Sequence, residues 1–246
     1  MPGQLDGRTA LIVGGAGGIG KAIGAAFVAE GARVVLADRS AEAADQTADA
    51  IGADAGIGLD VTDEDSVIAG VSAARDVLSR IDILVNSAGI ATQAPVAEMS
   101  LDMWNETLAV DLTGVFLVTH HVLPEMLERK SGRIINIASQ LGIKGGASLA
   151  HYCAAKAGVT AFTKSLALEV SSEGVLVNAI SPGPIETPMV AGIDEEWKAA
   201  KRKELPLGRF GQPEEVAPTA VLLASDPGGN LYVGANLGPN SGDVMP

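Results

Sequence analysis

Residues 9–20 read TALIVGGAGGIG, an apolar run that ends in a glycine-rich turn, and a helical pattern follows from Lys21 to Glu30. A strand, a glycine turn and a helix start in this order bring backbone N–H groups and the positive end of a helix dipole up to a pyrophosphate. Two overlapping glycine spacings fit such a loop, and one of them is G-x-G-x-x-G. The chain has 30 glycines, so the spacing alone is weak evidence. The expected contacts to a dinucleotide are Gly14, Gly15, Gly17, Gly18, Ile19 and Gly20.

The unit that follows the glycine turn strengthens this interpretation. Arg33 to Ala37 reads as a second buried strand, and it ends in Asp38, about 20 residues past the glycines, where an acidic residue hydrogen-bonds the adenosine ribose. The alternative role for Asp38 is that of a turn or helix-capping residue before Ser40. We favour the ribose role because strand, glycine loop and acid occur together.

Length and composition indicate one α/β domain over residues 1–246. The chain is 47% apolar and alternates strand and helix patterns, which is typical of a doubly wound parallel sheet with helices on both faces. Further strands are expected at Ala55 to Leu59, Ile81 to Val85, Arg133 to Ala138, Leu176 to Ile180 and near Ala235. Further helices are expected at Ala41 to Ile51, Asp63 to Ser79, Leu101 to about Arg129, His151 to Val170 and Pro213 to Ala224.

Charge and cysteine content exclude several classes of protein. The formal charge of −13 disfavours nucleic acid, anionic membranes and acidic protein partners, because all three reward basic patches. The single cysteine cannot form an internal disulfide, and no basic-then-apolar signal precedes the first strand, so we expect a cytoplasmic protein. Three histidines and one cysteine leave no ligand cluster for a catalytic zinc.

Tyr152 and Lys156 suggest chemistry because residues four apart share one face of a helix. An ammonium close to a phenol favours the ionised phenol, and a Tyr that titrates near neutrality is a usable general acid or base. Ser139 lies a short way upstream. Tyr-x-x-x-Lys alone is a weak signal, since such pairs recur on exposed helices.

Together these residues resemble the short-chain dehydrogenase/reductase family over nearly the whole chain. The matching residues are the glycine loop from Gly14 to Gly20, Asp38, Asp60 with Val61, Asn86 to Gly89, Ser139, Tyr152 with Lys156, Asn178, Pro182 with Gly183, and Thr187. The resemblance implies a single-domain Rossmann-type sheet, a nicotinamide cofactor, and hydride transfer to or from a carbonyl/alcohol pair.

The resemblance also implies a role for each matching residue. Tyr152 would be the general acid/base, Ser139 would hydrogen-bond the reacting oxygen, and Lys156 would bind the nicotinamide ribose and lower the pKa of Tyr152. The first part of the chain, to about residue 140, would bind the cofactor. Further cofactor contacts would be Arg39, Asp60, Val61, Asn86, Ala88, Gly89, Pro182, Gly183, Ile185 and Thr187.

Three residues depart from the family pattern. Val13 stands where the family usually has Thr, and Ser87 replaces the second Asn. Asp111 stands where the catalytic tetrad has an Asn that is thought to hold a proton-relay water. A carboxylate can also hold water, but it could pair with Lys156 and raise the pKa of that amine. Asp111 is therefore included among the catalytic residues together with Ser139, Tyr152 and Lys156.

The charged stretch from Asp194 to Glu204 has two interpretations. It is either a solvated helix face or part of a substrate-covering lid over about residues 184–208. In a lid, Met189 and Trp197 would supply the apolar underside. The expected substrate contacts are Ser139, Gln140, Tyr152, Met189 and Trp197.

We therefore expect an oxidoreductase, an NAD-dependent alcohol dehydrogenase or carbonyl reductase that acts on a fairly apolar secondary alcohol or ketone. Asp38 would repel a 2′-phosphate, so NADH should be preferred over NADPH. The alternatives are a 3-oxoacyl thioester reductase and a non-catalytic cofactor-binding redox sensor. Family resemblance and the apolar residues of the two long helices predict a homotetramer in which these helices pair across a two-fold axis. The tetramer would have a second interface through Pro213 to Ala224 and the C-terminal strand. Its C-terminal segment around Gly238 to Asn240 would help to close a neighbouring pocket.

Overall fold

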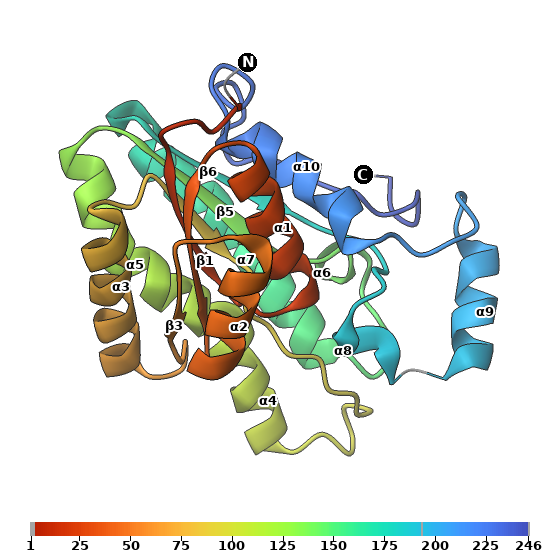
Figure 1. The fold of residues 1–246 in the computed structure, drawn as a ribbon. Coiled ribbons are helices and arrows are strands. Elements are labelled where there is room, and N and C mark those ends of the chain that lie inside the picture. Colours follow the sequence, from red (N-terminus) through yellow and green to blue (C-terminus); the bar gives the residue numbers. More distant parts are fainter. Residues whose placement is uncertain (1–2, 193, 246) are drawn as a thin grey trace.

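The computed structural model describes residues 3–192 and 194–245 and contains a seven-stranded parallel sheet with helices on both faces (Figure 1). The strands lie in the order β3-β2-β1-β4-β5-β6-β7, which confirms the predicted doubly wound sheet. The strands are β1 Thr9–Val13, β2 Arg33–Asp38, β3 Ala55–Gly58, β4 Ile83–Asn86, β5 Gly132–Ile137, β6 Val175–Ile180 and β7 Asn236–Leu237. Every predicted strand is present, with bounds that differ by one or two residues.

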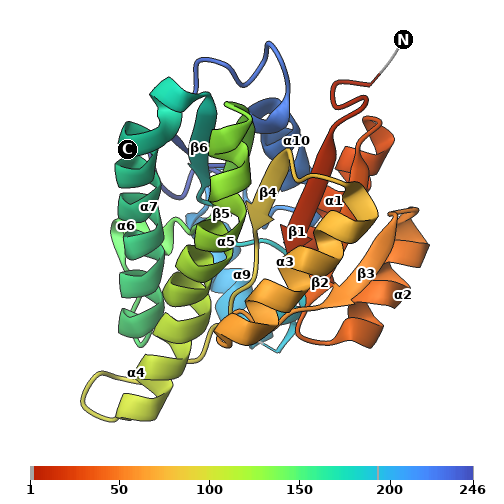
Figure 2. The same ribbon diagram turned by 90° about the vertical axis from the view of Figure 1, so that its left-hand side faces the viewer.

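Alternating side chains of the strands bury both faces of the sheet. In β1, Ile12 packs with Ile23 and Phe27 of α1, whereas Leu11 packs with Val118 of α5. Figure 2 shows α3, α5 and α7 in front of one face, and α1 and α10 lie on the other. The helices are α1 Gly18–Ala29, α2 Ala41–Ile51, α3 Glu64–Leu78, α4 Leu101–Leu108, α5 Gly114–Glu128, α6 Leu141–Lys144, α7 Ala150–Val170, α8 Pro188–Ala191, α9 Glu195–Glu204 and α10 Pro213–Ala224.

The predicted helix from Leu101 to Arg129 is interrupted by a π-helix at Ala109–Thr113, which joins α4 to α5. By length and composition alone, Leu101–Glu128 would be apolar enough to cross a membrane. Here one side of it packs on the sheet, where Val118, Val122 and Met126 are buried. Asp111 lies inside the π-helix and is completely buried. π-helical turns are frequent at functional sites, so the position of Asp111 inside one favours a functional role for this residue.

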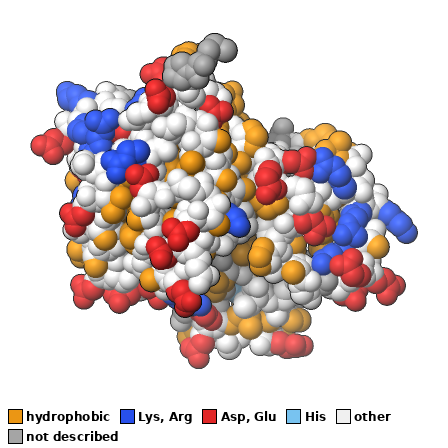
Figure 3. Space-filling model, viewed as in Figure 1, with side chains coloured by type: hydrophobic (Ala, Val, Ile, Leu, Met, Phe, Trp, Pro, Cys, Tyr) orange, Lys and Arg blue, Asp and Glu red, His pale blue; other side chains and the backbone are white. Residues whose placement is uncertain are grey.

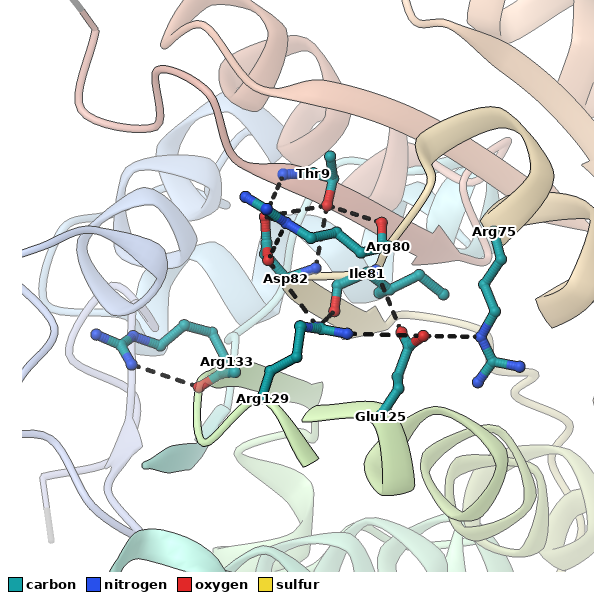
Figure 4. Close-up of polar contacts among 9 residues, drawn as sticks. Thr9, Arg75, Arg80, Ile81, Asp82, Glu125, Arg129 and Arg133 are labelled. Carbon is teal, nitrogen blue, oxygen red and sulfur yellow. Dashed lines mark hydrogen bonds and ion pairs between the residues drawn. The ribbon is translucent and has the colours of Figure 1, made fainter. Parts of the chain in front are cut away.

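A network of charged side chains, built around the buried Asp82, lies at the amino ends of the central strands (Figure 4). Asp82 accepts hydrogen bonds from the Thr9 backbone N–H at 3.1 Å and from Arg80 Nε at 2.9 Å. Glu125 of α5 accepts from Arg75 Nε at 2.9 Å and from the Ile81 backbone N–H at 3.2 Å. These bonds tie β1 and the start of β4 to α3 and α5. Ligands of such sheets bind at the opposite, carboxyl ends of the strands, so the network is structural.

Candidate active site

A cleft of 1010 Å³ opens at the carboxyl ends of the strands. The strand order reverses between β1 and β4, and this reversal is where open α/β sheets bind their ligands. The cleft continues past the sheet to the segment that contains α8 and α9. One cleft therefore joins the glycine loop to the predicted catalytic residues.

The glycine loop is shaped so that only glycines fit. Gly14 has φ +80°, and a Cβ there would lie 2.4 Å from the Ala88 backbone nitrogen. A Cβ on Gly20 would lie 2.2 Å from the Gly14 carbonyl oxygen. Helix α1 begins at Gly18, and its N-cap, Gly17, offers no side-chain hydrogen bond. This bare helix start beside the cleft fits the pyrophosphate of a dinucleotide cofactor.

The residues expected at the adenosine end line the same cleft. The Asp38 carboxylate, at the end of β2, accepts a hydrogen bond from the Ala16 backbone N–H at 3.2 Å, which holds it against the glycine loop. Asp60 accepts from the Thr62 hydroxyl at 2.7 Å and from its N–H at 2.9 Å. These bonds, together with nearby Arg39, lower the pKa of Asp60. Thr62 also lines the cleft and was not predicted.

Two predicted cofactor contacts, Gly15 and Asn86, do not line the cleft and stay predictions. Gly15 is buried behind the loop, where a Cβ would meet Leu36 at 2.8 Å. Asn86 is buried at the end of β4 and donates hydrogen bonds to Thr119 Oγ1 at 3.1 Å and Asn136 Oδ1 at 2.9 Å. Asn86 thus joins β4 to α5 and β5. The other predicted contacts line the cleft: Gly14, Gly17, Gly18, Ile19, Gly20, Asp38, Arg39, Asp60, Val61, Ala88, Gly89, Tyr152, Lys156, Pro182, Gly183, Ile185 and Thr187.

The replacement of Thr by Val13 does not separate the glycine turn from the neighbouring strand end. Val13 is buried, and its carbonyl accepts a hydrogen bond from the Ser87 N–H at 2.8 Å. The backbone therefore makes this connection without a side chain at position 13. Ser87 itself lines the cleft.

Ser139, Tyr152 and Lys156 converge in the middle of the cleft. Ser139 follows β5, and its Oγ accepts a hydrogen bond from the Leu141 N–H at 3.1 Å, which fixes the serine rotamer. Tyr152 and Lys156 share one face of α7, and Lys156 Nζ lies 5.7 Å from the centre of the Tyr152 ring. Lys156 Nζ also donates to the Ile137 carbonyl at 3.1 Å. The hydrogen bond to Ile137 therefore holds the Lys156 ammonium close to the Tyr152 ring.

Lys156 acts to lower the pKa of Tyr152, as expected, but in the protein alone the pKa of the phenol stays above its usual value. Burial raises the pKa of Tyr152 above its usual value, and the charge of Asp111 raises it further. The Lys156 ammonium and the Ser139 hydroxyl oppose these effects without cancelling them. The phenol is therefore protonated at neutral pH, which is the form that donates a proton to a carbonyl oxygen.

Asp111 forms the ion pair with Lys156 that the sequence suggested. Its Oδ2 lies 3.3 Å from Lys156 Nζ, and its Oδ1 accepts a hydrogen bond from the Ile90 N–H at 2.8 Å. Burial lowers the pKa of Lys156, but Asp111 and Tyr152 outweigh burial and raise it overall. A Cβ on Gly89 would lie 3.2 Å from Asp111 Oδ2, so a glycine there leaves room for the pair.

The segment containing α8 and α9 borders the substrate end of the cleft, as the lid interpretation predicts. Met189 and Trp197 line the cleft. Figure 3 shows acidic and basic side chains gathered over the outer side of α9, so this helix also has the solvated face of the other interpretation. Ile193, within the predicted lid, lies outside the described residues. The predicted substrate contacts Ser139, Gln140, Tyr152, Met189 and Trp197 all line the cleft.

Sequence reasoning did not place at the site four charged residues that line this end: Lys144, Lys201, Glu204 and Asp243. Asp243 lies in the C-terminal tail, which was expected to reach a neighbouring subunit. The tail also packs on its own chain, where the Gly183 N–H donates to the Pro239 carbonyl at 3.1 Å, and its contact with a neighbouring subunit stays a prediction. Burial acts to raise the pKa of Asp243, but hydrogen bonds from Lys144, Lys201 and Gln140 outweigh it and keep the carboxylate ionised.

No group of three His, Cys, Asp or Glu side chains within residues 3–192 and 194–245 lies close enough together to hold a metal ion. The cleft instead offers a phenol, a serine, three ion-paired lysines and backbone N–H groups. Such a set can bind a dinucleotide and exchange a proton with a substrate oxygen.

Comparison with known proteins agrees with this geometry. Residues 14–239 match the family described as "Enoyl-(Acyl carrier protein) reductase". The chain is 39% identical to 3-oxoacyl-[acyl-carrier-protein] reductase FabG of Vibrio cholerae over 243 residues, 98% of this chain and 99% of that protein. It is 43% identical to D-threitol dehydrogenase of Mycolicibacterium smegmatis over 231 residues, 91% and 88% of the two chains.

A solved structure of similar fold is a short-chain type dehydrogenase/reductase from Mycobacterium marinum. The TM-score is 0.94 at 32% identity, with 98% of this chain and 97% of that chain covered. The structural similarity therefore covers nearly the whole chain, including the cleft and the segment that contains α8 and α9.

Proposed function

The chain belongs to the short-chain dehydrogenase/reductase family and is an oxidoreductase, and from this premise we propose that it transfers a hydride between NAD(H) and a secondary alcohol or the matching ketone. The observation that carries the proposal is the position of Ser139, Tyr152 and Lys156. They lie between the glycine loop, which suits the dinucleotide, and the part of the same cleft that α8 and α9 border. When bound, the nicotinamide supplies or accepts the hydride.

The residues of the chain handle the proton and the reacting oxygen. In reduction, the protonated phenol of Tyr152 donates to the carbonyl oxygen, and the Ser139 hydroxyl hydrogen-bonds that oxygen and orients it. In oxidation, the ionised phenol takes the proton of the alcohol. The Lys156 ammonium, held by Asp111 and the Ile137 carbonyl, stabilises the ionised phenol.

A 3-oxoacyl thioester is the second candidate substrate, and the name of the Vibrio cholerae relative favours it. The charge of −13 disfavours an acidic carrier protein. Both candidates are tested by following the absorbance of the reduced nicotinamide with a panel of secondary alcohols, ketones and 3-oxoacyl thioesters. A steady rate with alcohols or ketones, above that with thioesters, supports the proposal. No turnover with any alcohol or ketone contradicts it.

The cofactor we propose is NAD(H). Asp38 is held toward the glycine loop and can accept both adenosine ribose hydroxyls, whereas a 2′-phosphate would meet its negative charge. Arg39, also in the cleft, offsets part of this repulsion. We expect kcat/KM to be higher with NADH than with NADPH, and Asp38→Ala to shrink the difference. Equal efficiency with both cofactors in the unmodified protein would contradict this assignment.

A further inference from the structure

His151 is a completely buried histidine that joins the start of α7 to the segment after β4. It is the second residue of α7 and directly precedes Tyr152. Its Nε2 lies 2.8 Å from Thr92 Oγ1, within hydrogen-bond distance. Its Nδ1 is buried and has no hydrogen-bond partner within residues 3–192 and 194–245. Among these residues, the imidazole therefore directs its polar contact to Thr92.

A buried imidazole with an unpaired nitrogen is costly, because that nitrogen has left water without gaining a partner. A phenylalanine at position 151 would fill a similar space and leave no polar atom unpaired. The hydrogen bond to Thr92 is what the histidine provides and a phenylalanine could not. The role of His151 therefore depends on what this bond holds in place.

The residues just before α7 hold the same segment through the backbone. The Ala94 N–H donates to the Ser148 carbonyl at 2.9 Å. Ser148 has φ +60°, a left-handed conformation that is uncommon for residues other than glycine. Residues in such conformations cluster at functional sites, where the surrounding structure holds them. Residues 148–151 thus bind residues 92–94 at two points.

The segment held in this way lines the cleft beside Lys156. Its lining residues are Gly89, Ile90, Ala91 and Gln93. A Cβ on Gly89 would lie 3.3 Å from Lys156 Nζ, so the backbone passes close to the ammonium. The Ile90 N–H donates to Asp111 Oδ1 at 2.8 Å. Residues 89–94 are therefore held by the π-helix at one end and by the start of α7 at the other.

We propose that His151 is a positioning residue for hydride transfer. Through Thr92 it fixes residues 89–94 against the start of α7, and so sets where the Tyr152 phenol lies relative to the wall of the cleft. His151 itself does not line the cleft. This inference rests on the proposed function and adds to the same site a residue that acts through its neighbours.

The first experiment separates the hydrogen bond from the ring. His151→Phe keeps a ring of similar size but cannot bond Thr92, whereas His151→Gln loses the ring but can place its amide near the Thr92 hydroxyl. The substrate is the alcohol of the panel with the highest kcat/KM. His151→Phe should lower kcat by about tenfold, and His151→Gln should restore most of this loss. The pH profile of alcohol oxidation should keep its midpoint, because Tyr152 remains the acid/base.

Thr92→Val tests the same bond from the other side. Thr92 is only half-buried, and valine keeps its shape without the hydroxyl, so this variant tests the inference even if His151→Phe does not fold. It should lower kcat as much as His151→Phe does. The double variant should lose no more than either single variant, because both substitutions break one bond.

His121→Phe is the matched control. His121 Nε2 lies 3.1 Å from Glu64 Oε1, and neither residue lines the cleft. This variant also loses a contact of a histidine between two segments, but it should leave kcat unchanged. An unchanged kcat in Thr92→Val would overturn the inference. So would equal losses in His151→Phe and His151→Gln, because the ring and not its hydrogen bond would then matter.

Failure of the proposed function gives a different result. If no alcohol or ketone turns over, the hydride-transfer proposal is wrong, and the positioning is then measured by amide hydrogen exchange. The N–H groups of Ile90 and Ala94 should exchange faster in Thr92→Val than in the unmodified protein, because their segment loses its link to α7. His121→Phe should leave their exchange unchanged. Equal exchange in Thr92→Val and the unmodified protein would overturn the inference.

Discussion

Tyr152 and Lys156 form one electrostatic unit, because each shifts the pKa of the other. Burial raises the pKa of the phenol, the ammonium lowers it, and the phenol helps to raise the pKa of the lysine. In the protein alone, burial prevails at Tyr152. Positive charge on an oxidised nicotinamide would add to that of Lys156. Alcohol oxidation, which needs the ionised phenol, should therefore become faster with rising pH, whereas ketone reduction should become slower once the pH passes the Tyr152 pKa.

Tyr152→Phe is the most direct test of the catalytic assignment. The variant keeps the ring and its packing but removes the proton that is transferred, so kcat should fall by about 10²–10⁴-fold. Binding of NADH, measured by titration of its fluorescence, should persist. Ser139→Ala is expected to lower kcat as well, through loss of the oxygen contact. If Tyr152→Phe reduces kcat by less than about tenfold, another group is the acid/base.

Asp111→Asn tests what the buried carboxylate contributes. Asn can still accept from the Ile90 N–H, but it removes the negative charge 3.3 Å from Lys156 Nζ. Because the charge of Asp111 raises the pKa of Tyr152, its loss should lower that pKa and move the pH profile of alcohol oxidation toward lower pH. We expect activity to be retained, since Asn is usual in the family. A large loss of kcat at every pH would mean that the carboxylate is required.

At the scale of elements, α9 depends on a cap at its start. Asp194 accepts a hydrogen bond from the Trp197 N–H at 3.0 Å, and the helix it begins carries Trp197 and Lys201 to the cleft. Its basic last turn suits the negative end of the helix dipole. Helix α9 is therefore held by its cap and by the bond from Lys201 to Asp243.

Removal of this cap should act on the substrate rather than on the cofactor. Loss of an N-cap costs about 0.5–2 kcal/mol of helix stability. Asp194→Ala should therefore raise KM for the alcohol several-fold and leave KM for NADH unchanged. Ser100→Ala is the control, because Ser100 caps α4 through the Met103 N–H at 3.1 Å and lies outside the cleft. Equal substrate KM values for the two variants would show that α9 does not cover the substrate.

The sequence predicted those parts of the site that lie in local motifs. The glycine loop, Asp38 and the pair Tyr152 and Lys156 each follow from spacing within one strand, turn or helix. The π-helix was missed because an extra residue in one turn scarcely disturbs the apolar pattern of a long helix. The side-chain hydrogen bonds of Asn86 could not be predicted, because spacing along a strand does not say which face a polar side chain takes at its end.

The contacts of Asp243 with Gln140 and Lys201 could not be predicted, because these residues lie far apart in the sequence. Gln140 and Asp243 are 103 residues apart in the chain, and Lys201 and Asp243 are 42 apart. Lysines and aspartates at such positions are ordinarily solvated, and nothing in their order marks them as partners. Only the path of the C-terminal tail past Gly183 brings them together.

At the scale of the whole molecule, several apolar side chains of the described residues are exposed, and two groups of them bear on assembly. Phe116 of α5 and Leu168 of α7 are 47% and 85% exposed. Leu231, in the segment that leads to β7, is 96% exposed. Single exposed apolar residues are ordinary, but here they lie on the two long helices and near the last strand, where the sequence predicts subunit contacts. We propose that both places are interfaces of a homotetramer.

The two interfaces should be separable by substitution. Phe116→Glu combined with Leu168→Glu places like charges on both sides of a two-fold axis, which should break the pairing of α5 and α7 and leave dimers. Leu231→Glu should break the other pairing, again giving dimers, and the three substitutions together should give monomers.

Ile68→Glu is the control, since Ile68 is similarly exposed on α3, outside both places. Light scattering at micromolar concentration measures each mass. A monomeric unmodified protein would refute the tetramer. Dissociation by Ile68→Glu would show that the substitutions act through general destabilisation rather than through the proposed interfaces.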